Sequence, residues 1–347
     1  QEGARAGGFR NVPELKKNIA MKIRDYVDNG GFLADFGGRG FFSPTAMVVR
    51  GDGRIFVASR GGGTVGIQMV TRDHDFFGQL GGYGKEPGQM IGPTALALDG
   101  EESLYVADDV LQRITVYDRE GELSTTWGTE GSGDGEFDGP SGMVFDSDDN
   151  MVLVDHKNHR VQRLTKDGKY LSKWGSFGDG DGQFNLPWGL AQDRAGNLYV
   201  ADWRNDRIQK FTPDGEFLAK YGVSGTGDGQ FNRPSGVAVD SEGNIYVADW
   251  GNQRLQVLDA DGVFLDKQRG EASLGLWAQE YISAQKDEEK ARSTYVPIFD
   301  VDTDDVHEAS ARIEPYFWDP VAVTLDDEDR AYVLETCRHR FQIYERA

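Results

Sequence analysis

One sequence unit recurs six times along this 347-residue chain, and this repetition limits the possible folds more than any other feature. Each copy contains a proline preceded three residues earlier by Phe or Met. These prolines are Pro44, Pro93, Pro140, Pro187, Pro234 and Pro320, spaced 49, 47, 47, 47 and 86 residues apart. Such a period is typical of architectures in which each copy packs only against its neighbours. The longer last gap predicts an insertion between copies five and six.

Each copy has the pattern of four short strands. In the fifth copy the run GVAVD, the turn SEGN, the run IYVAD, a polar loop, the run RLQVL and a turn before VFLDK follow one another. Tyr, Val and Ile favour strands, and Gly, Asn and Asp favour turns. Gly accounts for 46 of 347 residues, about twice its usual ~7 %, which fits many tight turns. Four strands repeated every ~45 residues predict the blades of a β-propeller, and six copies predict six blades.

The two ends of the chain are predicted to meet in the last blade. The sixth copy ends at RFQIYERA, one strand short, and GGFLADFG at residues 30–37 resembles the fourth strand GEFLAKYG of another copy. A strand at 31–37 would complete blade six and cover its open edge. We therefore predict an all-β, six-bladed propeller of four-stranded blades over residues 31–347, closed by that strand. Residues 1–30 are predicted to form a tail and helix.

Helical spacing of apolar residues also marks the two segments outside the repeat. Residues 11–28 carry Leu15, Ile19 and Ile23 at this spacing, and the insertion at 271–315 carries Leu274 and Trp277 on one apolar stripe. After that stripe, VPIFDVDTDDVHE is acidic and predicts a loop. A lid over the ligand entrance and a passive decoration are both open interpretations of the insertion.

The motif P-x-G-V-A-V-D … N-I-Y-V-A-D … N-x-R-[IV]-Q resembles NHL repeats. Copies three to five follow it closely, copy one lacks both its Asp and its Arg, and copy six has Glu335 in place of the Asp. The resemblance covers roughly residues 31–347 and implies a six-bladed propeller. It implies no single function, because this fold serves many purposes.

One face of the disc is predicted to carry the loops between strands two and three and the loops between blades, here called the loop face. An acid and an arginine lie five residues apart in five copies: Asp108 and Arg113, Asp155 and Arg160, Asp202 and Arg207, Asp249 and Arg254, and Glu335 and Arg340. We interpret each pair as a salt bridge, because an unpaired buried charge is costly. A ring of arginines that binds an anion is the alternative. The GDGQF loops predict glycine turns and a Phe plug between blades, with a bound divalent cation as the alternative.

Aromatic and polar side chains on this face form the predicted binding set. Trp203 and Trp250 occupy the same loop position in adjacent copies, and Trp188 begins the first strand of copy four. Exposed aromatics suit contacts with peptides or sugars, and packing between blades is the alternative. Three further members, Asp206, His159 and His339, share another loop position.

Candidates for a metal site are His156, His159 and His339, from blades three and six. The chain distantly resembles the NHL-related peptidyl-hydroxyglycine amidating lyases, and this resemblance implies zinc held by histidines in the central channel. Those lyases place a ligand histidine beside the proline of the first strand. Here that position holds Thr45, Thr94, Ser141, Trp188, Ser235 and Val321. We therefore predict no zinc site of that kind and no cofactor, with a bound divalent cation left open.

The amino-acid composition limits the kinds of partner that the chain is expected to bind. A net charge of −21 and a pI near 4.6 disfavour nucleic acids and anionic membrane surfaces. The single cysteine, Cys337, allows neither an internal disulfide nor a thiolate metal cluster. No apolar run reaches the ~18 residues that span a bilayer. The start QEGARAGG predicts a processed N-terminus and an extracytoplasmic location.

These features predict a non-enzymatic propeller that binds a peptide, protein or carbohydrate on its loop face. No nucleophile elbow, phosphate loop or HExxH motif is present. The alternative is a metal-dependent lyase or hydrolase, similar to the amidating lyases, with its site in the central channel. RNA binding would need a basic face, and the arginines are predicted to be paired. The ligand and the oligomeric state are not specified.

Overall fold

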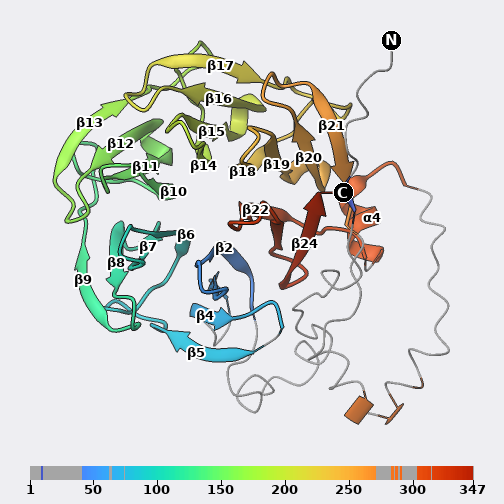
Figure 1. The fold of residues 1–347 in the computed structure, drawn as a ribbon, viewed down its shortest axis with the longest axis horizontal. Coiled ribbons are helices and arrows are strands. Elements are labelled where there is room, and N and C mark those ends of the chain that lie inside the picture. The colour runs from blue at the N-terminus through green and yellow to red at the C-terminus, as the bar shows by residue number, and fades with distance from the viewer. Residues whose placement is uncertain are drawn as a thin grey trace.

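Six four-stranded antiparallel sheets surround a central axis in the computed structural model of the protein (Figure 1). The structure describes residues 9–10, 41–61, 65–73, 75–270, 283–284, 286–287, 290, 303–313 and 315–346. The prediction of an all-β, six-bladed propeller is confirmed. The helices of the described residues are all too short or too polar to traverse a lipid bilayer.

Each blade runs from an inner strand at the axis to an outer strand at the rim (Figure 1). The strands are β2 (Pro44–Val49), β3 (Ile55–Ser59), β4 (Gly66–Val70) and β5 (Phe76–Leu80) in blade 1; β6 (Pro93–Leu98), β7 (Leu104–Asp108), β8 (Arg113–Tyr117) and β9 (Leu123–Trp127) in blade 2; β10 (Pro140–Phe145), β11 (Met151–Asp155), β12 (Arg160–Leu164) and β13 (Tyr170–Trp174) in blade 3; β14 (Pro187–Gln192), β15 (Leu198–Asp202), β16 (Arg207–Phe211) and β17 (Phe217–Tyr221) in blade 4; β18 (Pro234–Val239), β19 (Ile245–Asp249), β20 (Arg254–Leu258) and β21 (Phe264–Gln268) in blade 5; and β22 (Pro320–Leu325), β23 (Ala331–Glu335), β24 (Arg340–Arg346) and β1 (Phe9–Arg10) in blade 6. Short 3-10 turns follow the second strands of blades 3 to 5: η2 (His156–Asn158), η3 (Trp203–Asn205) and η4 (Trp250–Asn252).

The repeated proline is the first residue of every inner strand. Proline has no N–H to give to a ladder, so it is tolerated at the start of a strand and not in its middle. In blade 4, Pro187 lies opposite Asp202, and the register then shifts before Leu190. This arrangement brings the inner strand, the end of the second strand and the blade-to-blade loop together on the loop face.

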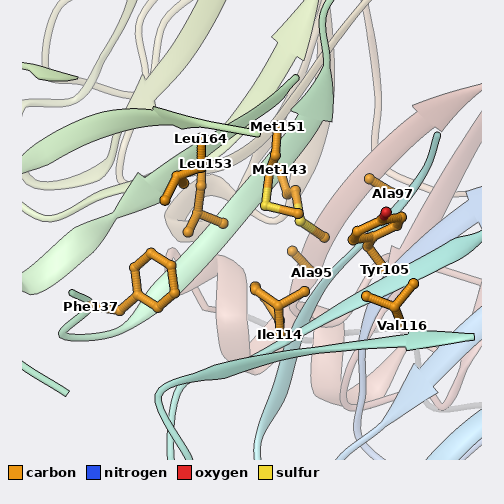
Figure 2. Close-up of a cluster of buried hydrophobic side chains, with 11 residues drawn as sticks. Ala95, Ala97, Tyr105, Ile114, Val116, Phe137, Met143, Met151, Leu153 and Leu164 are labelled. Atoms are coloured by element: carbon orange, nitrogen blue, oxygen red, sulfur yellow. The ribbon is translucent and has the colours of Figure 1, made fainter. Parts of the chain in front are cut away.

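The hydrophobic core lies between the blades. The residues three before each proline are almost completely buried: Phe41, Met90, Phe137, Phe184, Phe231 and Phe317. Figure 2 shows one such contact, in which Phe137 packs near Leu153 and Leu164 of blade 3 and Ile114 of blade 2. The predicted plug between blades is therefore confirmed.

The non-repeat segments are only partly described. The predicted closing strand at 31–37 and the predicted helix at 11–28 lie outside the described residues. Among the residues that the structure describes, β1 pairs with β24 at the edge of blade 6. Within the 271–315 insertion, α4 (Val306–Arg312) is a helix. The expectation of a loop over VPIFDVDTDDVHE is wrong for its last three residues, which begin this helix, because the Asp305 side chain caps the helix by accepting from the His307 backbone N–H. The apolar stripe with Leu274 and Trp277 lies outside the described residues.

Candidate functional site

The acid and arginine of the repeat form a buried clamp in blades 3 to 6. In blade 4 the Nε of Arg207 donates to Asp202 at 2.8 Å. Its Nη groups donate to the carbonyls of Asp179, Gly180 and Gln183 in the preceding loop. The equivalent pairs are Asp155–Arg160, Asp249–Arg254 and Glu335–Arg340. The salt-bridge interpretation is confirmed in these four blades, because the guanidiniums point into the protein and not toward a ligand.

Blade 2 departs from this pattern. Arg113 donates to the carbonyls of Lys85, Glu86 and Gln89, but its Nε is buried without a partner. Asp108 instead accepts backbone N–H groups, including those of Leu111 and Gly92. The predicted salt bridge is therefore wrong for this blade.

Two uncharged amide side chains explain why blade 2 lacks the salt bridge that blade 4 has. In blade 4, the amides of Asn205 and Gln209 also donate to Asp202 and hold its Oδ2 toward the arginine. Blade 2 has Leu111 and Thr115 at these two positions, so nothing turns the carboxylate of its acid toward the arginine.

We expect Leu111→Asn to raise the free energy of unfolding by about 1 kcal/mol, the usual net contribution of a hydrogen bond. The new amide would donate to Asp108 and turn its carboxylate toward Arg113. Urea unfolding of the whole chain measures the change, with Leu111→Ala as the control for loss of the leucine. Equal stability of the Asn and Ala variants would contradict the explanation.

A second repeated contact joins neighbouring blades, and we call it the inter-blade staple. The residue before the third strand has a left-handed backbone, and its side chain accepts the backbone N–H of the residue before the next blade's proline. The pairs are Gln112 to Gly139, His159 to Leu186, Asp206 to Arg233, Gln253 to Asp319 and His339 to Ser43. Val65 occupies the position in blade 1 and has no acceptor in its side chain.

This contact gives three of the predicted binding residues a structural role. The Nδ1 atoms of His159 and His339 accept at 3.0 and 2.9 Å, and the carboxylate of Asp206 accepts at 2.7 Å. Burial lowers the pKa of His339 to about 4 and also lowers the pKa of His159. Neutral imidazole is the form that can accept this hydrogen bond.

The central channel has an uncharged wall. It encloses about 390 Å³ and is lined by the six inner strands, whose polar side chains there are Thr45, Thr94, Trp188, Gln192, Ser235 and Thr324. None of the three candidate histidines lies on this wall. Within the described ranges, no cluster of three or more His, Cys, Asp or Glu residues is arranged to hold a metal ion.

The position that holds a ligand histidine in the amidating lyases joins adjacent blades in this chain. The hydroxyl of Thr94 donates to the carbonyl of Pro140 at 2.6 Å, and Thr45 donates to Pro93 at 2.7 Å. Ser235 makes the same kind of contact to the last blade. Trp188 has no hydroxyl and projects its ring toward His156 instead, with 5.0 Å between ring centroids.

Each second strand ends opposite the proline that begins the inner strand. The residues that directly follow the second strands therefore lie on the loop face beside the start of the inner strands, in a region we call the mouth of the channel: Arg60, Asp109, His156, Trp203, Trp250 and Thr336. On one side, Arg60 pairs with Asp109 at 2.7 Å, and Thr336 donates to a backbone carbonyl. The other side, in blades 3 to 5, is aromatic. The mouth therefore has a self-paired polar half and an aromatic half.

His156 is tightly enclosed in the aromatic half. Both of its ring nitrogens are buried and make no hydrogen bond within the described part of the chain. Burial, with a smaller contribution from Lys157, lowers its pKa to about 4. A Cβ at Gly139 would lie 2.1 Å from the imidazole, and Gly139 has φ +80, so only glycine fits there.

The two predicted tryptophans lie together. The ring centroids of Trp203 and Trp250 are 6.3 Å apart, and both side chains are partly exposed. The guanidinium of Arg233 lies 5.2 Å from the Trp203 ring and 6.0 Å from the Trp250 ring, and Arg204 lies 5.4 Å from Trp203. We call Trp203, Trp250, Arg204 and Arg233 the Trp–Arg cluster. From α4, His307 packs edge-on against Trp250 at 5.5 Å.

The aspartates of the GDGQF and GDGEF loops already have cationic partners. Asp134, Asp181 and Asp228 pair with Lys173, Lys220 and Lys267 on the outer strands. Each loop offers one or two carboxylates, fewer than a calcium loop provides. These contacts favour the interpretation of the loops as glycine turns over the alternative of a bound divalent cation.

Sequence reasoning missed Arg204, Arg233 and His307 as neighbours of the tryptophans. Arg204 directly follows Trp203, and Arg233 precedes the proline of the next blade. Their placement beside predicted aromatic loop residues is the signal that could have identified them.

Comparison with known proteins agrees with this architecture. The chain is similar in structure to virginiamycin B lyase from Staphylococcus aureus, with 11% identity, a TM-score of 0.54 and coverage of 89% of this chain and 96% of that one. It is similar to a gluconolactonase from Xanthomonas campestris, with 14% identity, a TM-score of 0.59 and 99% coverage of both chains. A protein of unknown function from Bacteroides thetaiotaomicron has 19% identity and a TM-score of 0.59 over 88% of this chain and 70% of that one. At such identities these proteins, enzymes among them, establish the fold alone.

The class defined by fold and repeat is the six-bladed β-propeller. The family model of the NHL repeat matches residues 184–211 and 231–258, in blades 4 and 5. The chain therefore contains NHL repeats within a six-bladed β-propeller, as its motif predicts. No curated protein matches it in sequence.

Proposed function

We propose that the protein is a non-enzymatic binding propeller that takes a peptide, protein or carbohydrate ligand on its loop face, at the Trp–Arg cluster of blades 4 and 5. The observation that carries this proposal is the partly exposed pair of Trp203 and Trp250 beside the mouth of the channel. Amphipathic aromatic side chains supply a large contact area at low entropic cost. The clamps and staples around the pair fix the loops that present it.

The enzyme alternative has less support. A metal-dependent lyase or hydrolase in the channel would need ligands or acid–base groups on its wall, and the described inner strands place no charged side chain or histidine there. His156 is enclosed against Trp188 outside that wall. The geometry therefore favours binding at the mouth over chemistry in the channel.

We expect the double substitution Trp203→Ala and Trp250→Ala to weaken ligand binding at least about tenfold, because it removes the central aromatic contacts. The measurement applies the labelled whole chain to an array of immobilised peptides and glycans and follows each positive spot by titration. Phe77→Ala is the matched control, since Phe77 is an exposed rim aromatic that also carries an arginine, Arg54, over its ring. Unchanged affinity of the double variant, with its melting temperature preserved, would remove the ligand from this cluster.

A further inference from the structure

Two arginines in the Trp–Arg cluster stand out in a chain with 58 acidic and 37 basic residues. Arg204 and Arg233 are exposed. Within the described residues, their guanidiniums contact tryptophan rings and no carboxylate. The nearby Asp206 accepts the backbone N–H of Arg233 and forms no ion pair with either side chain. In so acidic a protein, two exposed arginines that share one tryptophan and pair with no acid are a specific feature of this face.

The surrounding contacts hold these guanidiniums in place. Arg233 lies over both tryptophans, and Arg204 lies over Trp203. A guanidinium stacked on an aromatic ring keeps its edge N–H groups available, and this planar fork matches the two oxygens of a carboxylate. The staple from Asp206 fixes the backbone of Arg233. The site is thus preorganised for an oxyanion.

Neighbouring donors favour a peptide over a sugar. Amides that could bind the hydroxyls of a sugar are not available here, since those of Asn205 and Asn252 already donate within their loops. The face of Trp203 carries guanidinium groups. The groups left to contact a ligand are the two guanidiniums and the apolar edges of the tryptophan rings. A single carboxylate also meets less repulsion than a dianionic phosphate from a chain of net charge −21.

We propose that Arg204 and Arg233 bind the terminal carboxylate of a peptide whose last side chain is apolar and packs against Trp203 and Trp250. This rests on the proposed function and names the group that the same site recognises. The fork of each arginine takes the carboxylate oxygens, and the tryptophan edges contact the last side chain. An internal segment of a protein, which lacks the terminal carboxylate, is bound more weakly.

The test uses the tripeptide acetyl-Ala-Ala-Phe with a free carboxylate and the same tripeptide as its amide, which differ in one charge. Calorimetric titration of the whole chain is expected to give at least about tenfold tighter binding of the acid. Arg233→Ala should remove most of this preference, because the acid loses more affinity than the amide. Arg194→Ala, which removes an exposed arginine from the turn between β14 and β15 on the opposite face, should preserve it.

Three outcomes overturn the proposal: equal binding of acid and amide, no binding of the acid at millimolar concentrations, or tighter binding of glucuronate than of the acid. The last would assign the arginines to an acidic sugar. Loss of array binding in the double tryptophan variant, with an unchanged Arg233→Ala variant, would retain the proposed function and reject the carboxylate site. Arg233→Ala sensitivity with no tryptophan effect would retain a carboxylate contact at Arg233 but reject the tryptophan pair as the surface that binds the ligand.

Discussion

Replacing Arg207 with Ala is expected to lower the free energy of unfolding by about 3–5 kcal/mol, the cost of leaving a buried charge without its partner. Asp202 is completely buried and depends on this arginine for its counter-charge. The substitution also removes the donors to the carbonyls of Asp179, Gly180 and Gln183, which connect blade 4 to the preceding loop. Urea unfolding at neutral pH, followed by circular dichroism, measures the loss.

Blade 2 supplies the control for this experiment. Arg113 makes the same kind of contacts to loop carbonyls but no ion pair with Asp108, which is held by backbone N–H groups. Arg113→Ala should therefore cost about 1.5–3 kcal/mol, the range for hydrogen bonds that involve a charged group. Equal losses in the two variants would show that the buried carboxylate is not what makes the clamp important.

The pH dependence of the Arg207→Ala variant gives a second check. Burial raises the pKa of Asp202 even though Asn185, Asn205 and Arg207 donate hydrogen bonds to it. Without the arginine this pKa rises further, so the folded variant takes up a proton more readily than the unfolded chain. The destabilisation relative to the unsubstituted protein should then shrink as the pH falls.

The sequence predicted the blades because every strand, turn and plug recurs at the same place in each unit. It predicted the clamp for the same reason, since acid and arginine repeat together and are lost together in copy one. The failure in blade 2 arises from Leu111 and Thr115, which replace the amides that orient the acid in other blades. The fixed spacing of acid and arginine shows which charges can form an ion pair. The amide side chains that donate to the acid decide whether the pair forms.

The inter-blade staple was missed because its partners lie in different blades and its acceptor changes identity. Gln, His and Asp at one position look unrelated until all are seen to supply a side-chain acceptor. His159, His339 and Asp206 therefore have the same structural role, and their differing identities do not mark separate sites. The tryptophans of the Trp–Arg cluster repeat in blades 4 and 5, but its arginines have no such periodic signal, because Arg233 comes from the loop before Pro234 and the position of Arg204 holds Gly251 in blade 5.

We expect His339 to make the protein less stable as the pH falls from about 6.5 to about 4, by up to about 3 kcal/mol. Burial lowers the pKa of His339 to about 4 in the folded protein, whereas an unfolded histidine titrates near ~6.5. Above this range both states are neutral and the staple to Ser43, which joins blade 6 to blade 1, is intact. Within it the unfolded chain binds a proton that the folded chain excludes, so unfolding becomes easier.

His339→Gln isolates this contribution. Gln112 and Gln253 make the same staple through their amide oxygens, at 2.7 and 2.8 Å, and an amide does not titrate. The variant should match the unsubstituted protein near pH 7 and gain stability relative to it as the pH falls, in urea unfolding at a series of pH values. His307→Gln, in a partly exposed histidine of α4 that makes no staple, controls for removing one histidine. His156, whose pKa burial also lowers to about 4, is present in both proteins, so its contribution cancels. Unfolding curves for His339→Gln and the unsubstituted protein that stay parallel across this pH range would mean that protonation of His339 does not open the contact between blades 6 and 1.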